Sequence, residues 1–518
     1  MSLFALQAAN PDVNLSLIAP ELIVAVAGVV VMLVDAFARR AQHSITAILS
    51  IIALIAAGAA SIWLGVSWAG PHEAFNGMIV LDELRLSFTL IVLFVSVLTI
   101  LISTVWIEEE NLPAGEFHSL LLFATCGMML MASAGDLVIV FIGLEILSIA
   151  TYVLAGFRRT DVRSNEASLK YFILGSFASA FLLYGIALIY GATATGPDSP
   201  GTTNIVAIAG RLDHSLYPPL LLAGLAMLLV GFGFKIATAP FHVWTPDVYE
   251  GAPTPVTAFM AAGPKAAGFA SFMRVFLFGF PIATAAASTA GYAHKSWLGA
   301  LAIMAALTMT IGNVVAIAQN NVKRMLAYSS IAHAGYALVG FVAAGAATDA
   351  EQRSAALTAV AFYLLTYAIM NMGAFAVITL IARKDDRNNR VEDYNGIGFI
   401  SPVLAFSLSL FLLSLLGMPL TAGFMGKLMV FTAALRQGYV WLVVIGVLNA
   451  AVSAYYYLRL IIVMFFRESR TEWTAPRVPS AVALALVITI AGVLYLGMFP
   501  DRVISALSAK PNVTVHVR

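Results

Sequence analysis

Long apolar runs follow one another along almost the whole chain, separated by short polar stretches. Most runs are about 20 residues long, which is enough for an α-helix to cross the hydrocarbon core of a bilayer. They do not alternate at every second residue, as membrane-barrel strands do. The pattern predicts an all-α polytopic membrane protein. About fourteen transmembrane helices are expected, at 15–37, 44–66, 81–106, 118–133, 136–156, 167–191, 218–240, 256–278, 297–318, 323–346, 355–382, 400–435, 440–466 and 480–499.

Two of the predicted spans contain glycine and proline at related places. Residues 231–235 read Gly-Phe-Gly-Phe-Lys and are followed by Pro240, and residues 423–427 read Gly-Phe-Met-Gly-Lys. The second copy is preceded by Gly417 and Pro419, in a span that is too long for one straight crossing. We therefore predict that helices 7 and 12 are discontinuous. Paired interruptions of this kind point to the ion pathway of a transporter.

The two Gly-Phe-x-x-Lys segments lie five spans apart, so they cross the membrane in opposite directions. This count predicts two inverted five-helix repeats. A weaker echo relates Ser148-Ile-Ala-Thr in the fifth span to Ser330-Ile-Ala-His in the tenth. The predicted units are helices 1–3 in 1–117, the first repeat of helices 4–8 in 118–280, the second repeat of helices 9–13 in 296–467, and helix 14 with the tail in 468–518.

The loops carry the signal for orientation. Three stretches are expected to be real loops, at 191–217, 241–255 and 383–396. If the N-terminus lies outside, most of the loop lysines and arginines fall on the inner side. The positive-inside rule then places both termini outside, which is the periplasmic side in a bacterium.

Composition agrees with a membrane protein and excludes several classes of function. The 518 residues are 61% hydrophobic and only 11% charged, with a mean hydropathy of +0.92 and a net charge of +1, whereas soluble domains carry roughly 25% charge. Nothing here indicates nucleic-acid binding. Cys126 is the only cysteine, so thiolate sites for zinc or iron–sulfur clusters are not expected. Nucleotide-binding fingerprints are also missing, so we expect no metal and no redox cofactor in this chain.

Four ionisable residues fall near the middle of predicted spans: Glu145, Lys235, Lys265 and Lys427. Charged side chains are rare and costly inside a bilayer, so each is a candidate functional group. A carboxylate and an amine that approach to about 4 Å in a medium of effective dielectric near 20 attract each other by ~4 kcal/mol. A Glu145–Lys235 contact that forms and breaks would therefore change the proton affinity of both groups. We predict a proton relay through these residues.

Structural roles remain open for the same residues. Glu145 could be a hydrogen-bonded structural acid, and the lysines could extend their amines toward water. The second alternative is strongest for Lys265, which follows Gly263-Pro264. His333 lies near mid-span and either relays protons or is a satisfied core histidine.

Other polar residues in or near the spans are expected to be structural. Arg85 and Arg274 lie near span ends and should snorkel to the interface. Arg459 stays undecided, and His242 should lie at the membrane surface in a structural role. The tyrosines at 455–457 are expected to serve packing or to lie at the interface rather than to take part in chemistry.

Two longer stretches carry a family resemblance. Residues 235–256 read Lys-Ile-Ala-Thr-Ala-Pro-Phe-His-Val-Trp-Thr-Pro-Asp-Val-Tyr-Glu-Gly-Ala-Pro-Thr-Pro-Val, and residues 321–335 read Asn-Val-Lys-Arg-Met-Leu-Ala-Tyr-Ser-Ser-Ile-Ala-His-Ala-Gly. Both resemble signatures of the antiporter-like proton channel family. That family includes three large membrane subunits of respiratory complex I, the proton-pumping NADH:quinone oxidoreductase, and subunits of multi-subunit Na⁺/H⁺ antiporters. The resemblance extends over nearly the whole chain.

The resemblance implies a fold and roles for the candidate residues. The family fold has two inverted five-helix bundles with broken helices 7 and 12. Glu145 and Lys235 match the family's glutamate–lysine pair, Lys265 its central lysine, and Lys427 its helix-12 residue. His333 matches a histidine of the central polar chain. Lysine rather than glutamate at 427 argues against the middle antiporter-like subunit of complex I.

The implied function is that of a non-redox membrane subunit of a proton-translocating NADH:quinone reductase. Quinone reduction elsewhere in the complex would drive protons through the Glu/Lys relay. NAD, FMN, iron–sulfur clusters and quinone would then reside in partner subunits. The implied partners are other membrane-arm subunits, including another antiporter-like subunit and a small helical subunit, together with lipid, in the bacterial inner membrane. Two alternatives stay open, a subunit of a standalone multi-subunit Na⁺/H⁺ antiporter and a non-transporting assembly subunit.

Overall fold

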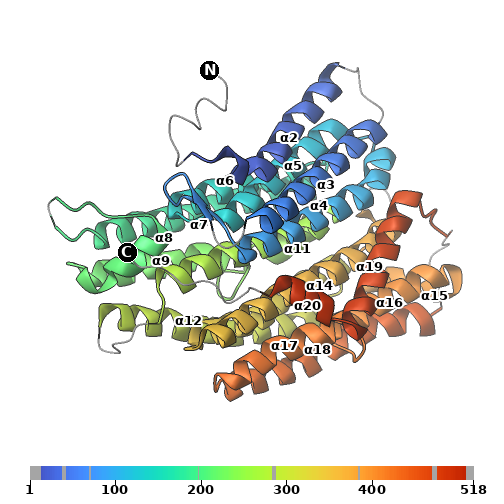
Figure 1. Cartoon of the computed structure of the whole chain (residues 1–518). Coiled ribbons are helices and arrows are strands. Elements are labelled where there is room, and N and C mark those ends of the chain that lie inside the picture. Colours follow the sequence, from blue (N-terminus) through green and yellow to red (C-terminus); the bar gives the residue numbers. More distant parts are fainter. Residues whose placement is uncertain are drawn as a thin grey trace.

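The fold was analysed in a computed structural model, which describes residues 13–37, 43–68, 72–196, 198–282, 288–382, 386–468 and 475–508. Long helices dominate it and lie side by side (Figure 1). The helices are η1 (Leu15–Ile18), α2 (Ala19–Phe37), α3 (His43–Ser67), α4 (Glu83–Glu110), α5 (Ala114–Ser133), α6 (Leu137–Ala155), α7 (Val162–Ala192), α8 (Ile205–Arg211), η2 (Leu212–His214), α9 (Pro218–Lys235), α10 (Thr245–Gly251), α11 (Thr254–Gly279), α12 (Thr289–Ile317), α13 (Val322–Ala346), α14 (Ala350–Ala382), η4 (Val391–Tyr394), α15 (Ile397–Ile400), α16 (Pro402–Leu416), α17 (Ala422–Arg436), α18 (Val440–Phe466), α19 (Ser480–Met498) and α20 (Asp501–Leu507).

The apolar runs become the long helices, which confirms the all-α membrane prediction. Among the described residues, 12 helices are long and apolar enough to cross a membrane. The two other predicted spans correspond to α11, which carries a lysine and an arginine, and to the interrupted pair α16 and α17. The predicted number of fourteen crossings is therefore not confirmed by length and composition.

The predicted loops contain more structure than expected. Residues 191–217 include α8 and η2, residues 241–255 include α10, and the described part of 383–396 includes η4. These elements are too short to give a helical period in sequence, so they were missed. A small antiparallel pair, β1 (His72–Ala74) and β2 (Ile79–Leu81), lies beside the tight α5–α6 turn. There the amide of Gly135 donates to the carbonyl oxygen of Met78 at 2.8 Å.

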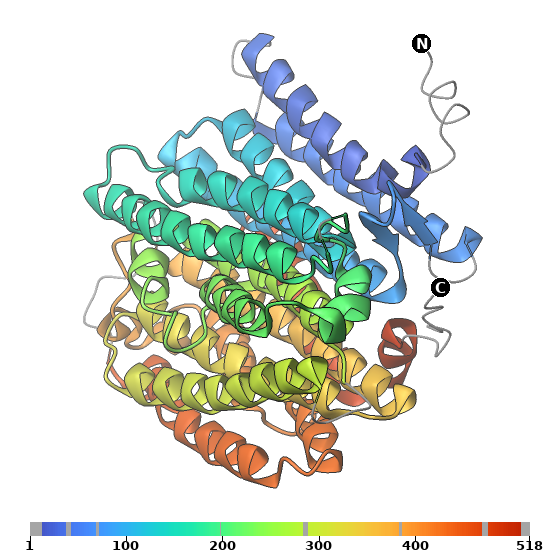
Figure 2. The ribbon, with the colours of Figure 1, turned by 90° about the vertical axis from the view of Figure 1, so that its left-hand side faces the viewer.

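Helix α11 lies at the centre of the molecule. It packs against α4, α5, α13 and α14, and nearly all its side chains are buried. On one side, α5 packs on α6 and α7 on α9; on the other, α12 packs on α13 and α14 on α17. Figure 2 shows the two groups along the bundle, with α2 and α3 at one edge. The same pairs thus recur in the two predicted repeats, whose boundaries stay a prediction.

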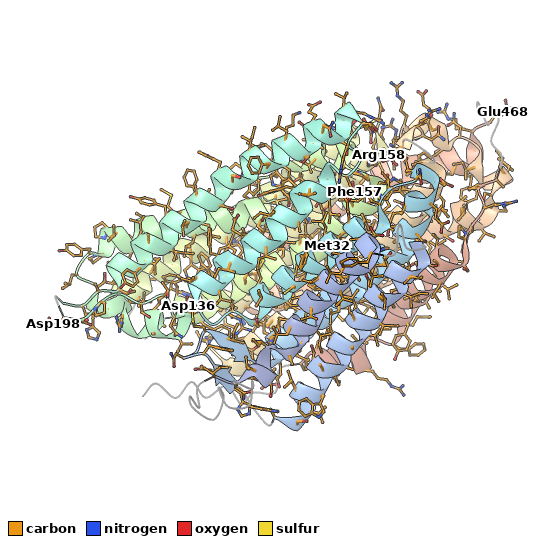
Figure 3. The ribbon with its side chains drawn as sticks, turned by 90° about the horizontal axis from the view of Figure 1, so that it is seen from above. Met32, Asp136, Phe157, Arg158, Asp198 and Glu468 are labelled. Atoms are coloured by element: carbon orange, nitrogen blue, oxygen red, sulfur yellow. The ribbon has the colours of Figure 1, made fainter. Side chains whose placement is uncertain are left out.

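The helix ends divide between two ends of the bundle. Arg158, after α6, and Glu468, after α18, lie at one end, whereas Asp136 and Asp198 lie at the other (Figure 3). This alternation agrees with the predicted order of crossings. The terminal residues 1–12 and 509–518 lie outside the described residues, so the predicted location of the two termini stays a prediction.

Two arginines that were expected to snorkel are buried instead, so that prediction is wrong. The guanidinium of Arg85 is 2.8 Å from a carboxylate oxygen of Glu21, and that of Arg274 is 2.6 Å from Asp82. Asp82 also caps α4 by accepting from the amide of Arg85 at 2.8 Å. Buried charges are stable when they are paired and hydrogen-bonded, which explains why these arginines need not reach water. The pairs join α2, α4 and α11.

Candidate functional site

The interruption of the seventh span comes directly after Lys235. Helix α9 ends at this lysine, Ala237 has a positive φ of 60°, and the chain becomes helical again only at α10. The side chain of Lys235 is 6% exposed, and its amine donates to the hydroxyl of Ser148 at 2.8 Å. Its stem lies along α11 beside Gly268, one turn beyond Lys265. The break therefore leaves the amine buried between α6 and α11.

Glu145 lies on α6, one turn before Ser148, and is half-buried. Its carboxylate accepts a short hydrogen bond from the hydroxyl of Ser179 on α7. The amine of Lys235 and the carboxylate of Glu145 do not form an ion pair, which would require an N···O distance of 4.0 Å or less. The hypothesised direct contact is therefore not formed in this structure. A small cavity of about 10 Å³, lined by both serines and Lys235, lies between the three helices. This volume is at the lower limit for one water molecule.

Lys265 is held in the centre of the protein. It is 2% exposed, and its amine donates to the backbone oxygen of Ser330 at 2.5 Å and to the hydroxyl of the same residue at 2.6 Å. The amine also lies 5.5 Å from the ring centroid of Tyr367 on α14. Pro264 lies inside α11 without ending it. The predicted alternative that this amine reaches water does not describe the structure.

His333 is buried among tyrosines on α13. Its Nδ1 is 2.6 Å from the hydroxyl of Tyr363, and its Nε2 is 3.3 Å from the hydroxyl of Tyr457. Tyr457 also forms a short hydrogen bond with Ser329. Packing or a place at the interface was predicted for the tyrosines at 455–457; Tyr455 is exposed, whereas Tyr456 and Tyr457 are buried. Tyr457 instead completes the hydrogen bonds of a buried imidazole.

Lys427 lies beside the second interruption. Helix α16 ends at Leu416, Gly417 has a φ of +96°, and α17 begins at Ala422. The amine of Lys427 forms no ion pair within the described residues. It donates to the carbonyl oxygens of Leu415 at 3.0 Å and Leu416 at 2.7 Å. These carbonyls are open because a helix end leaves its last oxygens without amide partners. The predicted break near 417–419 is therefore confirmed, and it supplies the ligands of the lysine.

Aromatic rings connect three of the predicted residues. The ring of Tyr367 lies 5.5 Å from the Lys265 amine and 5.0 Å from the His333 ring. The ring of Tyr336 lies 5.6 Å from His333 and 4.8 Å from the Lys427 amine. The structure thus brings Lys265, His333 and Lys427 into one region. Glu145 and Lys235 form a second region, which is joined to the first by packing along α11.

The sequence missed the serines and tyrosines that hold these groups. Lys235 donates to Ser148, and Lys265 donates to Ser330. These two serines are the matching positions in the weak Ser-Ile-Ala echo between the fifth and tenth spans. The repeated Ser-Ile-Ala sequence therefore could have identified both serines that accept hydrogen bonds from buried lysine amines. The partners Ser179, Tyr363 and Tyr457 have no comparable sequence signal.

A buried ionic cluster lies at the end of the bundle that carries Arg158. Asp386 is 3.2 Å from the amine of Lys323 and 3.5 Å from the guanidinium of Arg158, and it accepts from the hydroxyl of Thr254 at 2.8 Å. Lys323 also donates to the backbone oxygen of Ala252, just after α10. Burial alone raises the pKa of the Asp386 carboxyl, but Lys323 and Arg158 outweigh burial and hold its pKa below the ordinary 3.8. The cluster fastens the end of the first interruption, just after α10, and the segment that follows α14 to the start of α13.

Arg459, which the sequence left undecided, and His242, which was predicted to be structural, both have structural surroundings. Arg459 donates to the backbone oxygens of Ile317 and Gln319 and thereby caps the end of α12. His242 is half-buried in the interruption after α9. No group of three or more His, Cys, Asp or Glu residues in the described ranges could hold a metal ion.

These features define a polytopic membrane protein with two interrupted helices and a buried row of basic residues between them. A family model described as NADH:quinone oxidoreductase/Mrp antiporter, transmembrane, matches residues 134–453. NADH-quinone oxidoreductase subunit N of Trichlorobacter lovleyi is 47% identical over 494 residues, which cover 95% of this chain and 96% of that protein. The chain belongs to the family of NADH-quinone oxidoreductase subunit N.

Solved structures show the same fold. A chain of respiratory complex I from Thermus thermophilus with bound aureothin is 37% identical, with a TM-score of 0.75, and the match covers 94% of this chain and 99% of that one. A chain of the membrane-bound sulfane sulfur reductase, an archaeal respiratory membrane complex, is 26% identical, with a TM-score of 0.80 and 95% of each chain covered. The predicted family resemblance is thereby confirmed.

Proposed function

We propose that this chain is the antiporter-like, proton-translocating membrane subunit of an NADH:quinone oxidoreductase. One observation carries the proposal beyond the family. Lys235, Lys265 and Lys427 are all buried, and within the described part of the chain their amines form hydrogen bonds to neutral oxygens only. A buried cation without a counterion is costly. Amines in this situation are suited to binding and releasing protons, whereas structural lysines are usually paired.

The proposed relay has two parts. Glu145 and Lys235 form the first, in which Ser148 and Ser179 hold the amine and the carboxylate apart. A small movement that closes the pair to about 4 Å would couple the charges by ~4 kcal/mol at an effective dielectric near 20. This coupling is large enough to change the protonation of the lysine. The serines would then be the alternative partners of the open state.

The second part contains Lys265, His333 and Lys427. The amine of Lys265 lies at the Ser330 hydroxyl, and Tyr367 separates it from His333. Hydroxyl groups can accept and donate a hydrogen bond at once, so the tyrosines that bond His333 can pass a proton along. Transfer between Lys235 and Lys265 requires a rearrangement or water, because no polar side chain among the described residues bonds to both amines.

The remaining predictions follow as part of the same proposal. The energy comes from quinone reduction in other subunits, and moving one proton against 100 mV costs ~2.3 kcal/mol. NAD, FMN, iron–sulfur clusters and quinone belong to those partners. The neighbours are membrane-arm subunits, including another antiporter-like subunit and a small helical subunit, and lipid. The chain lies in the bacterial inner membrane with both termini periplasmic, and it comprises the four predicted units.

Replacement of Lys235 by alanine tests this function in membranes that carry the assembled complex. We expect NADH-dependent quinone reduction and proton translocation to fall together, while a blue-native gel shows normal assembly. The control is Lys295→Ala, which removes an exposed lysine from α12. Unchanged oxidation and pumping in Lys235→Ala would reject the relay role of this lysine.

The same membranes distinguish the alternatives. A loss of Na⁺/H⁺ exchange that does not depend on NADH would favour a standalone antiporter subunit. Loss of the assembled complex in Lys235→Ala, with normal turnover in whatever assembles, would favour a subunit that serves assembly alone.

A further inference from the structure

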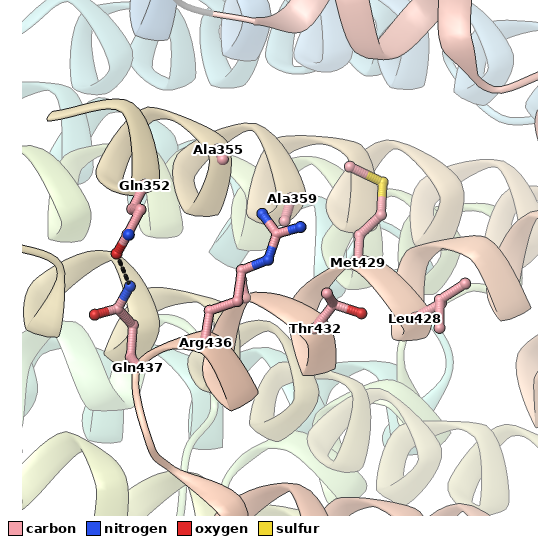
Figure 4. A pocket seen from close by; sticks show the side chains of 9 residues that line it. Gln352, Ala355, Ala359, Leu428, Met429, Thr432, Arg436 and Gln437 are labelled. Carbon is pink, nitrogen blue, oxygen red and sulfur yellow. Dashed lines mark hydrogen bonds between the residues drawn. The ribbon is translucent and has the colours of Figure 1, made fainter. Parts of the chain in front are cut away.

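A pocket of about 290 Å³ lies between α14 and α17, at the end where α14 begins and α17 ends (Figure 4). One wall is formed by Leu428, Met429, Thr432 and Arg436 of α17, and the other by α14. These α17 positions recur at helical spacing on the face opposite to Lys427, because residues 428, 432 and 436 lie about 100–180° around the helix from 427. The pocket is therefore separate from the proposed proton relay, and the following inference does not depend on it.

Polarity changes along the pocket in one direction. Leu428 and Met429 lie toward the middle of the helix, Thr432 lies one turn further, and Arg436 lies at the helix end. The opposite wall shows the same order, from Ala359 and Ala355 to Gln352 at the start of α14. From Leu428 to Arg436 the rise is about 12 Å at 1.5 Å per residue. The pocket therefore combines an apolar part with a guanidinium, as binding of an acyl chain and its anionic headgroup requires.

The mouth of the pocket carries an uncompensated charge. Figure 4 shows the guanidinium of Arg436 over Ala359 and the hydrogen bond of 2.7 Å between Gln437 and Gln352 beside it. The pocket lining contains no aspartate or glutamate, and Arg436 forms no ion pair within the described part of the chain. A guanidinium matches the paired oxygens of a phosphodiester. The absence of a lining carboxylate disfavours an amine headgroup.

We propose that this pocket binds one anionic phospholipid. Its phosphodiester accepts hydrogen bonds from Arg436, and the neighbouring glutamine amides contact the rest of the headgroup. One acyl chain lies over Leu428 and Met429, further along α17 than the guanidinium. A lipid held here fills the space between α14 and α17, and α17 is the helix that carries Lys427.

The test uses the assembled complex with phosphatidylglycerol that carries a diazirine in one acyl chain and an alkyne tag. After illumination, the label on peptides of α14 and α17 is measured by mass spectrometry. We expect labelling at 355–359 and 428–433, which Arg436→Gln lowers by about tenfold, because a charge-assisted hydrogen bond is lost. Arg502→Gln, which removes an exposed arginine of α20, should leave the labelling unchanged.

A second variant keeps the arginine and closes the apolar part. Ala355 is exposed at the pocket, so Ala355→Trp fills it without repacking the core and should also abolish labelling. Unlabelled phosphatidylglycerol should compete with the probe at least tenfold better than phosphatidylethanolamine. Equal labelling in all variants, or equal competition by both lipids, would overturn the proposal. A photo-reactive residue in place of Thr432 that cross-links to another subunit would also overturn it, because the occupant would then be protein.

Discussion

Removal of the Asp386 charge should destabilise the protein strongly, although Asp386 is not one of the proposed proton-carrying residues. Asp386→Asn is the cleanest change, since Asp386 has a φ of +46° and asparagine tolerates this left-handed region. The amide keeps the shape and loses only the charge. Among the described residues, the fully buried Lys323 then has no counterion, and Arg158 keeps only Glu110 and Asp161.

The expected magnitude follows from the geometry. At an effective dielectric near 20, charges 3.2 Å and 3.5 Å apart attract by about 5 kcal/mol each. The cost of burying the ions cancels much of this attraction. Breaking such a pair while its partner stays buried typically costs about 3–5 kcal/mol. We therefore expect the free energy of unfolding to fall by about 3–5 kcal/mol.

The measurement is a denaturant titration of the purified chain in detergent, followed by tryptophan fluorescence. Asp198→Asn, at the opposite end of the bundle and exposed, should change the free energy by less than about 0.5 kcal/mol. The double variant Asp386→Asn with Lys323→Met should recover much of the loss, because the orphaned cation is gone. A loss below about 1 kcal/mol in the single variant, or a double variant no more stable than the single, would refute the reasoning.

Three further outcomes follow from the same structure. Gly417→Ala and Gly438→Ala both place a side chain at positive φ and should each cost about 1–2 kcal/mol of stability. Only Gly417→Ala brings a methyl group to 3.2 Å from the Cδ atom of Lys427. Only this variant should therefore also slow proton translocation in proteoliposomes. Tyr457→Phe removes a hydroxyl that bonds the histidine of α13 and should slow NADH-driven proton uptake several-fold, whereas Tyr455→Phe, at an exposed ring, should not; equal rates would contradict the role of that hydroxyl. Finally, the lowered pKa of Asp386 means that its stabilisation is complete at neutral pH, above the ordinary value of 3.8, and is lost as pH falls through the folded-state pKa. Between pH 6 and pH 2, the thermal midpoint of Asp386→Asn should fall less steeply with decreasing pH than that of the unmodified protein. An equally steep fall in both proteins would contradict the stabilising role of the Asp386 carboxylate.

The helices were predictable because each apolar run is continuous. The predicted span 440–466 coincides with α18, and 400–435 was too long for one helix, as the break at Gly417 confirms. A run of hydrophobic residues determines a span without reference to any other part of the chain. Glycine and proline then locate the interruption within it.

The partners of charged residues were not predictable in the same way. Arg85 and Arg274 were expected to reach water, because a single sequence does not show that Glu21 and Asp82 are folded against them. Asp386 likewise lies 63 residues from Lys323 in the chain, and the packing of α13 against α14 brings the start of α13 close to the segment that follows α14. Long-range pairing depends on tertiary structure, which apolar periodicity does not encode.

The central claim, that buried lysines of this chain carry protons, is tested most directly at Lys265. This residue lies at the centre of α11, and methionine has nearly its length without the amine. Lys265→Met and the exposed control Lys295→Met would be compared in the assembled complex, reconstituted in proteoliposomes. The quantity measured is the number of protons moved per NADH oxidised, after assembly is checked on a blue-native gel. We expect a lower proton yield, or a joint loss of oxidation and pumping, in Lys265→Met alone. An unchanged yield at an unchanged rate would show that the Lys265 amine carries no protons.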